Sequence, residues 1–338
     1  MVKISATIKD VAKYTSLSIA TISKYINGGN VLEENKIKIQ QAITQLNFKV
    51  NVMARGLKTN KSMTIGILIP SFINTFCMEI ISNIENVLLK YGYSALICDY
   101  REDTEIEDLK LKFLISKSVD GLILMPSGED EEIIKEFTKQ DIPVVIIDRA
   151  LKQMICDTVL VDNMNASYDA VEQLIIKGHR RIAIITGPQN IYTASERLKG
   201  YNRIHEDYSI AIDEKLVKYG NYKMDSGYDL LKDLLSSEDP PSAVFVTNYE
   251  MTLGAIMAIN EMNIVIPDQL SIIGFDGLEL TKIVKPHLSL VFQPVQEIGE
   301  TAGEVIIKRI KGDVSSFPEM YRLKTKLVMG ESVKKYSN

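Results

Sequence analysis

The body of this chain carries polar side chains directly after its short apolar runs, where a bound molecule could meet them. These carboxylates, amides, hydroxyls and guanidiniums supply both hydrogen-bond acceptors and donors. Such a mixture suits a polyhydroxylated ligand, because every hydroxyl group both donates and accepts. The candidates are Ser71, Asn74, Ser127, Asp148, Arg149, Asp162, Asn163, Arg197, Asn248, Asp276 and Gln293.

Each of these residues also has a plainer structural interpretation. Asp and Asn favour turns and helix caps, so their position after a strand is not specific for a ligand. For Asp162 and Asn163, helix capping explains the sequence at least as well as ligand contact. For Asp148, Arg197 and Asp276, at strand or helix ends, the sequence favours ligand contact.

Catalysis finds little support in the sequence. The three histidines, His179, His205 and His287, are far apart. No glycine-rich phosphate loop, nucleophile elbow or paired metal motif occurs. The three cysteines, Cys77, Cys98 and Cys156, lack metal-ligand spacing and are expected to be reduced thiols. We therefore expect a protein that is not an enzyme, with no cofactor and no metal.

The elements that must position the polar residues are buried strands alternating with helices. Continuous apolar runs separated by amphipathic segments indicate parallel sheets covered on both faces. The runs fall in two sets: 64–70, 94–98, 121–125 and 144–147, then 181–186, 243–246 and 271–275. Two sets predict two doubly wound α/β lobes, and ligands bind beyond the carboxyl ends of such strands.

The first sixty residues differ from this body in charge. They hold nine Lys and Arg against three acids, a net charge of +6, whereas the remainder carries −11. A basic segment on an acidic body fits a protein that meets a polyanion at one end. A solvated basic face would give the same numbers, so charge alone does not decide between them.

The pattern of residues 7–46 predicts three helices. Thr7 and Asp10 have the spacing of a capping box, and Ser18 is a natural N-cap for a second helix. Ile22 faces inward, leaving Ile19, Ala20, Thr21, Ser23 and Lys24 for the outer face and the first turn. Asn30 is expected to cap the third helix, whose inner face would be Ile37, Ile43 and Leu46. This arrangement is typical of a helix-turn-helix, whose second helix enters the major groove.

Residues 51–59 form a short segment that would need support to be helical. Isolated helices below about 12–15 residues are marginal in water, and Gly56 weakens this one further. On DNA, Leu57 could act as an apolar wedge in the minor groove, with Asn51, Arg55 and Lys58 near phosphates or groove edges. The alternative is a plain linker with one incidental leucine.

These motifs, in this order, resemble the lactose-repressor/galactose-repressor (LacI-type) family along essentially the whole chain. The resemblance runs through the hinge residues Asn51 to Leu57, the Ser195–Tyr201 segment with Arg197, Thr247-Asn248, and Gly274–Asp276. It implies an α/β, periplasmic-binding-protein-like body behind an all-α helix-turn-helix head. The DNA-binding residues that it implies are Thr7, Ser18, Ile19, Ala20, Thr21, Ser23, Lys24, Asn27, Asn51, Ala54, Arg55, Leu57 and Lys58.

For the effector site, the resemblance implies Asp276 and Arg197 as ligand contacts and adds two aromatic side chains. Tyr222 stands where the family often stacks an aromatic on the ligand ring. Phe76 is the single aromatic where many sugar-binding members have a pair, which leaves the ligand class open.

The head also departs from the family pattern. Lys24 stands at a usual arginine, Ser16 at a usual turn glycine and Leu32 at a usual serine. Lysine lacks the planar fork that arginine offers to guanine, so the operator sequence is expected to drift. Ile19-Ala20 looks most like the catabolite-control members of the family.

The sequence thus predicts a cytoplasmic, homodimeric transcriptional repressor that binds a near-palindromic DNA operator under control of a small molecule, in the first place a sugar. A catabolite-control regulator that responds to a phosphorylated carrier protein is the alternative, and a solute-binding protein is a weaker one. The expected domains are the head (1–50), the hinge (51–62) and the body (63–338). The first lobe is expected at about 63–161 plus 293–321, and the second at about 162–292 plus 322–338.

Overall fold

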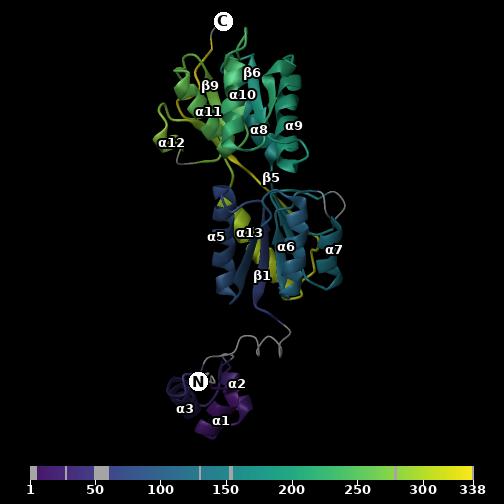
Figure 1. Ribbon diagram of the computed structural model, residues 1–338, viewed down its shortest axis with the longest axis vertical. Helices are drawn as coiled ribbons and strands as arrows, with labels where there is room; N and C mark the ends of the chain where they lie inside the picture. The colour runs from purple at the N-terminus through teal and green to yellow at the C-terminus, as the bar shows by residue number, and fades with distance from the viewer. Residues whose placement is uncertain are drawn as a thin grey trace. The chain divides into compact units, whose positions relative to one another are not determined.

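The computed structural model describes residues 6–26, 29–48, 61–128, 131–151, 155–277 and 280–336 (Figure 1). The predicted DNA-binding residues Asn27, Asn51, Ala54, Arg55, Leu57 and Lys58 lie outside these ranges. The chain divides into two compact units, residues 1–62 and 63–338, which are described separately.

The head is a bundle of three helices, α1 (Ile8–Thr15), α2 (Ile19–Ile26) and α3 (Glu33–Gln45). Its core is formed by Val11, Ile22, Ile39 and Ala42. At the start of α1, the Thr7 amide donates to the Asp10 carboxylate at 2.8 Å, which is one half of the predicted capping box. The all-α helix-turn-helix head is therefore present as the sequence predicts.

The third helix differs from its prediction at its start and in one residue of its inner face, since Ile43 and Leu46 pack against the core as predicted but Ile37 does not. The residue that precedes it is Leu32, not Asn30, and Ile37 is 55% exposed. The buried stripe instead begins at Ile39 and continues through Ala42. Because the apolar residues of a helix recur every three to four positions, a stripe through Ile39 and Ala42 turns Ile37 to the solvent.

Ser16 ends α1 in the left-handed conformation, with φ of 57°. Glycine adopts that conformation without steric cost, whereas a residue with a Cβ is strained there. The serine at this turn therefore keeps the backbone path that a glycine would take.

The first lobe is a parallel sheet in the order β11-β5-β4-β3-β1-β2. Its strands are β1 (Thr64–Ile69), β2 (Ser94–Asp99), β3 (Gly121–Leu124), β4 (Val144–Ile147), β5 (Asp157–Val161) and β11 (Met320–Leu323). Helices α5 (Thr75–Lys90) and α13 (Val295–Ile310) pack on one face. Helices α6 (Thr104–Ser116) and α7 (Glu131–Lys139) cover the other face.

The second lobe repeats this design with a sheet in the order β12-β10-β9-β8-β6-β7. Its strands are β6 (Ile182–Thr186), β7 (Val217–Tyr219), β8 (Ala243–Val246), β9 (Ser271–Phe275), β10 (Ser289–Phe292) and β12 (Lys326–Val328), the last antiparallel to β10. Helices α10 (Met224–Leu235) and α11 (Tyr249–Glu261) pack on one face. Helices α8 (Asn163–Ile176) and α9 (Tyr192–Asp207) pack on the other; the short helices η1 (Glu214–Leu216) and α12 (Leu280–Ile283) lie in connections.

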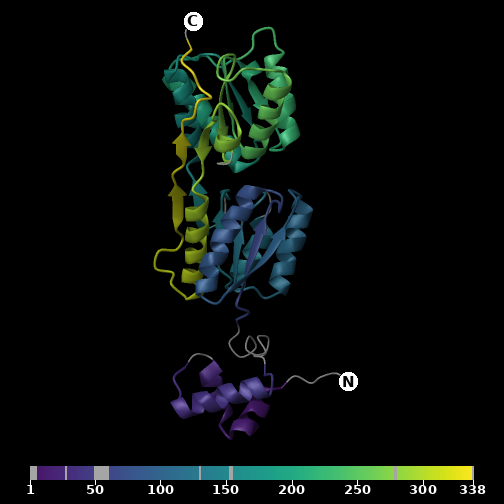
Figure 2. The same ribbon diagram turned by 90° about the vertical axis from the view of Figure 1, so that its left-hand side faces the viewer.

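The chain crosses between the two lobes after β5, after β10 and between β11 and β12 (Figure 2). The last crossing follows Leu323, slightly beyond the predicted lobe boundary at 321. The sequence pattern gave no indication of β5, β7, β10, β11 or β12. Strands β5 and β10 are buried but begin with polar residues, which leaves apolar runs of only three residues in each. Strands β7, β11 and β12 are partly exposed and carry charged residues rather than continuous apolar runs.

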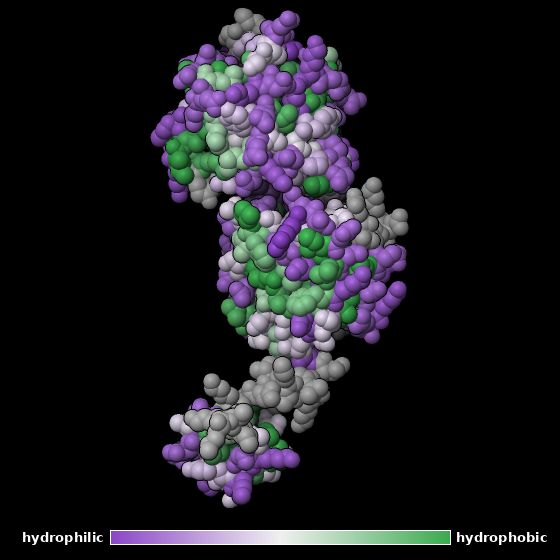
Figure 3. Space-filling view, in the orientation of Figure 1, coloured by the Kyte–Doolittle hydropathy of each residue, from purple (hydrophilic) through white to green (hydrophobic). Residues whose placement is uncertain are grey.

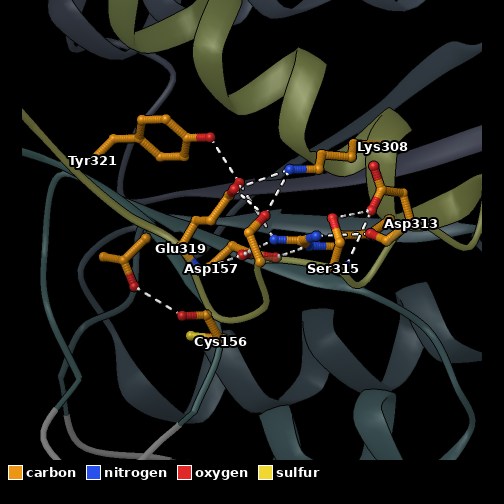
Figure 4. A network of polar contacts seen from close by, with 10 residues as sticks. Cys156, Asp157, Lys308, Asp313, Ser315, Glu319 and Tyr321 are labelled. Carbon is orange, nitrogen blue, oxygen red and sulfur yellow. Dashed lines mark hydrogen bonds and ion pairs between the residues drawn. The ribbon is translucent and has the colours of Figure 1, made fainter.

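A buried ion pair fixes α13 and the start of β11, the part of the chain that returns from the second lobe, to β5 of the first lobe (Figure 4). The Arg309 guanidinium, at the end of α13, donates to both carboxylate oxygens of Asp157 at 2.8 Å. The Glu319 amide, just before β11, donates to the same carboxylate at 2.8 Å. Asp157 therefore joins β5 to α13 and β11, although Arg309 and Glu319 follow it by 152 and 162 residues in the sequence.

We predict that Arg309→Met lowers the free energy of unfolding by about 3–5 kcal/mol, because it leaves the buried Asp157 carboxylate without its cation. Urea unfolding followed by circular dichroism measures this loss. Arg322→Met, the same substitution at an exposed position on β11, is the control and should change the value by less than about 1 kcal/mol. Equal unfolding curves for Arg309→Met and the unsubstituted protein would contradict a stabilising role for the pair.

Candidate functional site

The body contains a pocket of about 90 Å³ lined by residues from both lobes. Most of the predicted effector residues line it: Asn74, Phe76, Asp148, Arg149, Arg197, Tyr222, Asn248, Asp276 and Gln293. They follow the carboxyl ends of strands or begin the helices behind them, as expected for ligand sites in open parallel sheets. A larger groove of about 630 Å³ adjoins the pocket and shares Phe76, Tyr249, Asp276 and Gln293 with it.

Two predicted residues, Ser71 and Ser127, do not line the pocket. The Ser71 hydroxyl accepts a hydrogen bond from the Ile73 amide at 3.2 Å, which shapes the loop before α5. The Ser127 amide donates to the buried Glu107 carboxylate at 3.1 Å. Both serines therefore support loops behind or beside the pocket, and Glu107 is a structural residue that the sequence did not reveal.

Capping explains Asp162, as the plainer interpretation allows. Its side chain accepts from the Asn165 amide at the start of α8. Asn163 is 1% exposed and does not line the pocket. Its amide oxygen instead accepts from Arg197 Nε at 2.8 Å, so Asn163 positions a pocket residue.

Arg197 organises the pocket wall in the second lobe. Its guanidinium donates to Asn163 and, through Nη1, to the Thr247 carbonyl at 2.5 Å. It also stacks on the Phe275 ring, with 3.7 Å between the guanidinium carbon and the ring centroid. These contacts tie α9 to the ends of β8 and β9 and leave the side chain only 4% exposed.

Asp148 and Arg149 form the corresponding part of the first lobe, directly after β4. Arg149 Nη1 donates to the Tyr100 hydroxyl and the Pro126 carbonyl, each at 3.1 Å. Asp148 has a φ of 66°, a strained conformation of the kind that gathers at functional sites. Burial raises the pKa of Asp148, although Arg149 and Arg197 partly oppose that shift.

Asp276 and Gln293 bring together the end of β9 and the crossing after β10. Gln293 Nε2 donates to the Asp276 carboxylate at 2.7 Å, and the Gln293 amide donates to it at 3.2 Å. Desolvation raises the pKa of Asp276 to about 6, in spite of the opposing effects of Arg197 and these hydrogen bonds. Asp276 therefore carries a carboxylate charge that the pocket only partly compensates.

Tyr222 is held in the pocket by hydrogen bonds from both its side chain and its backbone. Its hydroxyl lies 3.2 Å from the Thr193 hydroxyl, and its carbonyl accepts from Asn248 Nδ2 at 3.1 Å. A side chain at Gly187 would overlap the tyrosine ring, which explains the glycine there. Tyr222 has a φ of 65°, a conformation that is rare for a bulky residue. Asn248 also caps α11 through the Met251 amide at 3.1 Å.

Sequence reasoning missed several residues of the pocket. They are Pro70, Glu102, Thr193, Tyr249 and Glu250. Tyr249 and Glu250 directly follow the recognised Thr247-Asn248 pair, so their neighbourhood was a usable signal. Glu102 offered none, since the turn that presents it, with positive φ at both Arg101 and Glu102, has no Asn or Gly to indicate it.

Of the predicted DNA-binding residues, those that the structure describes lie on α2 and at the N-terminal ends of α1 and α2. Ile19 is 45% exposed, and Ala20 and Lys24 are exposed as well, so these side chains are available to a groove. The Ser18 hydroxyl accepts from the Thr21 amide at 3.1 Å, which makes Ser18 the cap of α2. At the start of α1, the Thr7 amide and hydroxyl both donate to the Asp10 carboxylate, while Thr21 and Ser23 are half-buried.

The described residues hold no cluster of His, Cys, Asp and Glu that could bind a metal ion. The three cysteines are all buried as free thiols. Among the helices in the described ranges, none combines the length and apolar character needed to cross a membrane.

Comparison with known proteins agrees with the two units. Residues 7–51 match the model of bacterial regulatory proteins of the lacI family. Residues 62–324 match the model of periplasmic binding proteins and the sugar-binding domain of the LacI family. The chain therefore belongs to the LacI family. It is a DNA-binding transcriptional repressor whose body binds a controlling effector.

Individual relatives span nearly the whole chain. Catabolite control protein A of Priestia megaterium is 33% identical over 90% of this chain and 92% of its own length. The HTH-type transcriptional repressor PurR of Aliivibrio fischeri strain MJ11 is 32% identical over 97% of this chain and 98% of its own. Among solved structures, a complex of the transcriptional regulator CelR with cellobiose has a TM-score of 0.74 and 26% identity, covering 97% of this chain and 99% of that chain.

We predict that Asp276→Asn changes how stability depends on pH. Because the pKa of Asp276 rises from 3.8 to about 6 on folding, its protonated form stabilises the ligand-free protein below about pH 4. That contribution is lost as the pH rises through about 6. Between pH 4 and pH 7, Asp276→Asn should therefore gain up to about 3 kcal/mol of stability relative to the unsubstituted protein.

Urea unfolding of both proteins at each pH measures this difference. Asp162→Asn makes the same change at a helix cap outside the pocket and should follow the pH profile of the unsubstituted protein. A constant difference between Asp276→Asn and the unsubstituted protein across the range would show that Asp276 has an ordinary pKa.

Proposed function

We propose that this repressor is a homodimer whose affinity for a near-palindromic operator is set by a polyhydroxylated effector, in the first place a sugar, bound in the pocket between the lobes. The effector contacts would be the nine predicted residues that line the pocket, with Asp148, Arg197 and Asp276 as the principal ones.

The observation that carries the effector class is a pair of buried polar atoms on the pocket residues Arg149 and Gln293. Each side chain is 8% exposed, yet Arg149 Nε and Gln293 Oε1 have no hydrogen-bond partner among the described residues. One atom is a donor and the other an acceptor, and a buried polar group without a partner costs about 1–3 kcal/mol. A hydroxyl-bearing ligand would satisfy both atoms, because hydroxyls donate and accept.

The position of these residues explains how binding could reach the DNA. Asp148 and Arg149 belong to the first lobe, and Arg197 and Asp276 to the second. A ligand that contacts both lobes favours one of their relative orientations over others. A coupling free energy of about 1–3 kcal/mol would change operator affinity by roughly 5–150-fold. The pocket does not fix whether the effector weakens or strengthens DNA binding.

The DNA contacts are proposed from the exposed part of α2 and from the hinge residues. Ile19, Ala20 and Lys24 would read the major groove, while Leu57 would enter the central minor groove beside its symmetry mate. A homodimer supplies two heads for two half-sites. Figure 3 shows hydrophobic residues gathered on the surface of the first lobe, and Leu109 (64% exposed) and Leu89 (60%) are among its exposed apolar side chains. An apolar surface of this kind supports pairing of the body with a second copy.

Control by a phosphorylated carrier protein is the second candidate, because a catabolite control protein is among the relatives. A phosphoserine partner would need free basic side chains on the first lobe. At the end of α13, however, Arg309 is bound to Asp157, and Lys308 is paired with Glu319 at 2.9 Å. Because both of these basic side chains are already paired within the protein, we favour the small-molecule effector over the carrier protein. We also propose that the chain has no catalytic activity, since its relatives are regulators.

A thermal-shift screen of the full-length protein against sugars, sugar acids, sugar phosphates, nucleosides and purines tests the proposed effector class. Ligands that bind the native state raise the melting temperature by mass action. Sugars should give a clearer increase than sugar acids, sugar phosphates, nucleosides or purines, and Gln293→Met should weaken sugar binding at least about tenfold by removing an acceptor.

Gln296→Met is the matched control, because Gln296 is on the first turn of α13 and does not line the pocket. It should bind sugars as the unsubstituted protein does. Stabilisation by nucleosides or purines alone would replace the sugar proposal, and no stabilisation by any compound would favour the carrier protein.

For the hinge, Leu57→Ala should reduce specific operator affinity by at least about a hundredfold, since the wedge that stabilises the bent duplex is removed. Fluorescence anisotropy with operator DNA measures this loss. Effector binding by the same variant should be unchanged, which serves as the internal control. Unaltered operator affinity would reduce residues 51–59 to a linker.

A further inference from the structure

The pocket contains more acidic than basic side chains. Four carboxylates line it, those of Glu102, Asp148, Glu250 and Asp276, against the two guanidiniums of Arg149 and Arg197. The formal surplus is two negative charges. A neutral sugar would not compensate this surplus, so its distribution bears on the kind of polyhydroxylated ligand that the pocket takes.

Both arginines are already engaged by the scaffold. Arg197 donates to Asn163 and the Thr247 carbonyl and stacks on Phe275. Arg149 donates to Tyr100 and the Pro126 carbonyl, and its ion pair with Asp148 is long, at 3.8 Å. Their hydrogen bonds are therefore directed mainly toward the strand ends behind the pocket, while their charges partly offset those of the Asp148 and Asp276 carboxylates.

Glu102 and Glu250 face the pocket from opposite lobes without a cation of their own. Glu102 is presented by the turn after β2 in the first lobe, and Glu250 by the first turn of α11 in the second. Among the described residues, neither carboxylate has a hydrogen-bond or ion-pair partner. No lysine lines this pocket among the described residues, and Lys282 and Lys326 line only the adjoining groove.

An acidic pair can simply be solvated, and Glu250 also complements the N-terminus of α11. A separate observation indicates a ligand in the same pocket. Gln293 is 8% exposed, and its Oε1 has no partner among the described residues, so an acceptor lies ready for a donor group. Arg149 Nε requires an acceptor at the same time. The missing partner must therefore both donate and accept, while the surrounding charge favours a positive group.

We propose that the effector is a polyhydroxylated molecule that carries a protonated primary amine, an amino sugar with a free amino group being the simplest example. Its ammonium group lies between Glu102 and Glu250, and its hydroxyls contact Gln293 and Arg149. This proposal rests on the proposed function, since it specifies the ligand of the same pocket. Ligand binding then joins the two lobes through charge as well as through hydrogen bonds.

The same charge distribution discriminates against other ligands. Sugar phosphates and sugar acids would place a further negative charge beside four carboxylates, which is unfavourable in a partly desolvated site. N-acetylation of the amine removes the positive charge and keeps an N–H donor, but it adds an acetyl group. The neutral parent sugar has a hydroxyl of nearly the same size at that position, so the free amine and its parent sugar are the sharpest pair of probes, and the N-acetyl form is a second uncharged comparison.

Isothermal titration of the full-length protein with glucosamine, galactosamine and mannosamine, each beside its neutral parent sugar and its N-acetyl form, tests the proposal. At pH 7, at least one amino sugar should bind at least about tenfold more tightly than both of its counterparts. This preference should shrink as ionic strength rises, because salt screens partly exposed charges.

The double variant Glu102→Gln, Glu250→Gln should lose the preference while it still binds the neutral sugar. Glu105→Gln is the matched control, because Glu105 is exposed on the first turn of α6 and does not line the pocket. This variant should keep the preference. Binding of a neutral sugar as tightly as its amino form, or a preference that survives in the double variant, would overturn this inference and leave the proposed function intact. Absence of binding by all nine compounds would overturn the inference, and the screen above would then decide separately whether the proposed sugar class also fails.

Discussion

The pocket between the two lobes of the body depends on one buried guanidinium, that of Arg197. It holds the Asn163 side chain at the start of α8 and the Thr247 carbonyl at the end of β8, and it stacks on Phe275 at the end of β9. The ends of neighbouring parallel strands are thereby fixed around a single charge. That charge also opposes the rise in the pKa of Asp148 and Asp276, so it makes a site with two buried carboxylates tolerable.

The Arg309–Asp157 pair has the corresponding role in the first lobe, at the end of the sheet where the strands begin. It joins α13, β5 and the segment before β11, so the part of the chain that returns from the second lobe becomes a part of the first. The lobes share several crossings and are not independent domains joined by one linker. A ligand that changes their relative orientation must therefore act on a pair of stiff bodies, which suits the transmission of a signal.

The pocket combines backbone strain with incomplete hydrogen bonding. Asp148, Tyr222 and Asp276 all have positive φ, and Arg149 Nε and Gln293 Oε1 lack partners among the described residues. Each feature costs stability that only the surrounding scaffold offsets. Strained backbone and buried polar atoms without hydrogen-bond partners thus occur together in this pocket.

The sequence by itself determined the helix-turn-helix head, the two parallel-sheet lobes and the types of residue at the strand ends, because apolar periodicity and capping patterns are local. It could not place Ser71 and Ser127 outside the pocket or turn Ile37 to the solvent, since each outcome depends on packing between distant segments. Strands β11 and β12 exist because β5 and β10 offer them edges, not because of their own sequences. Only the tertiary structure brought Glu102 and Glu250 to one pocket, since charge balance is a property of neighbours in space and not of neighbours in sequence.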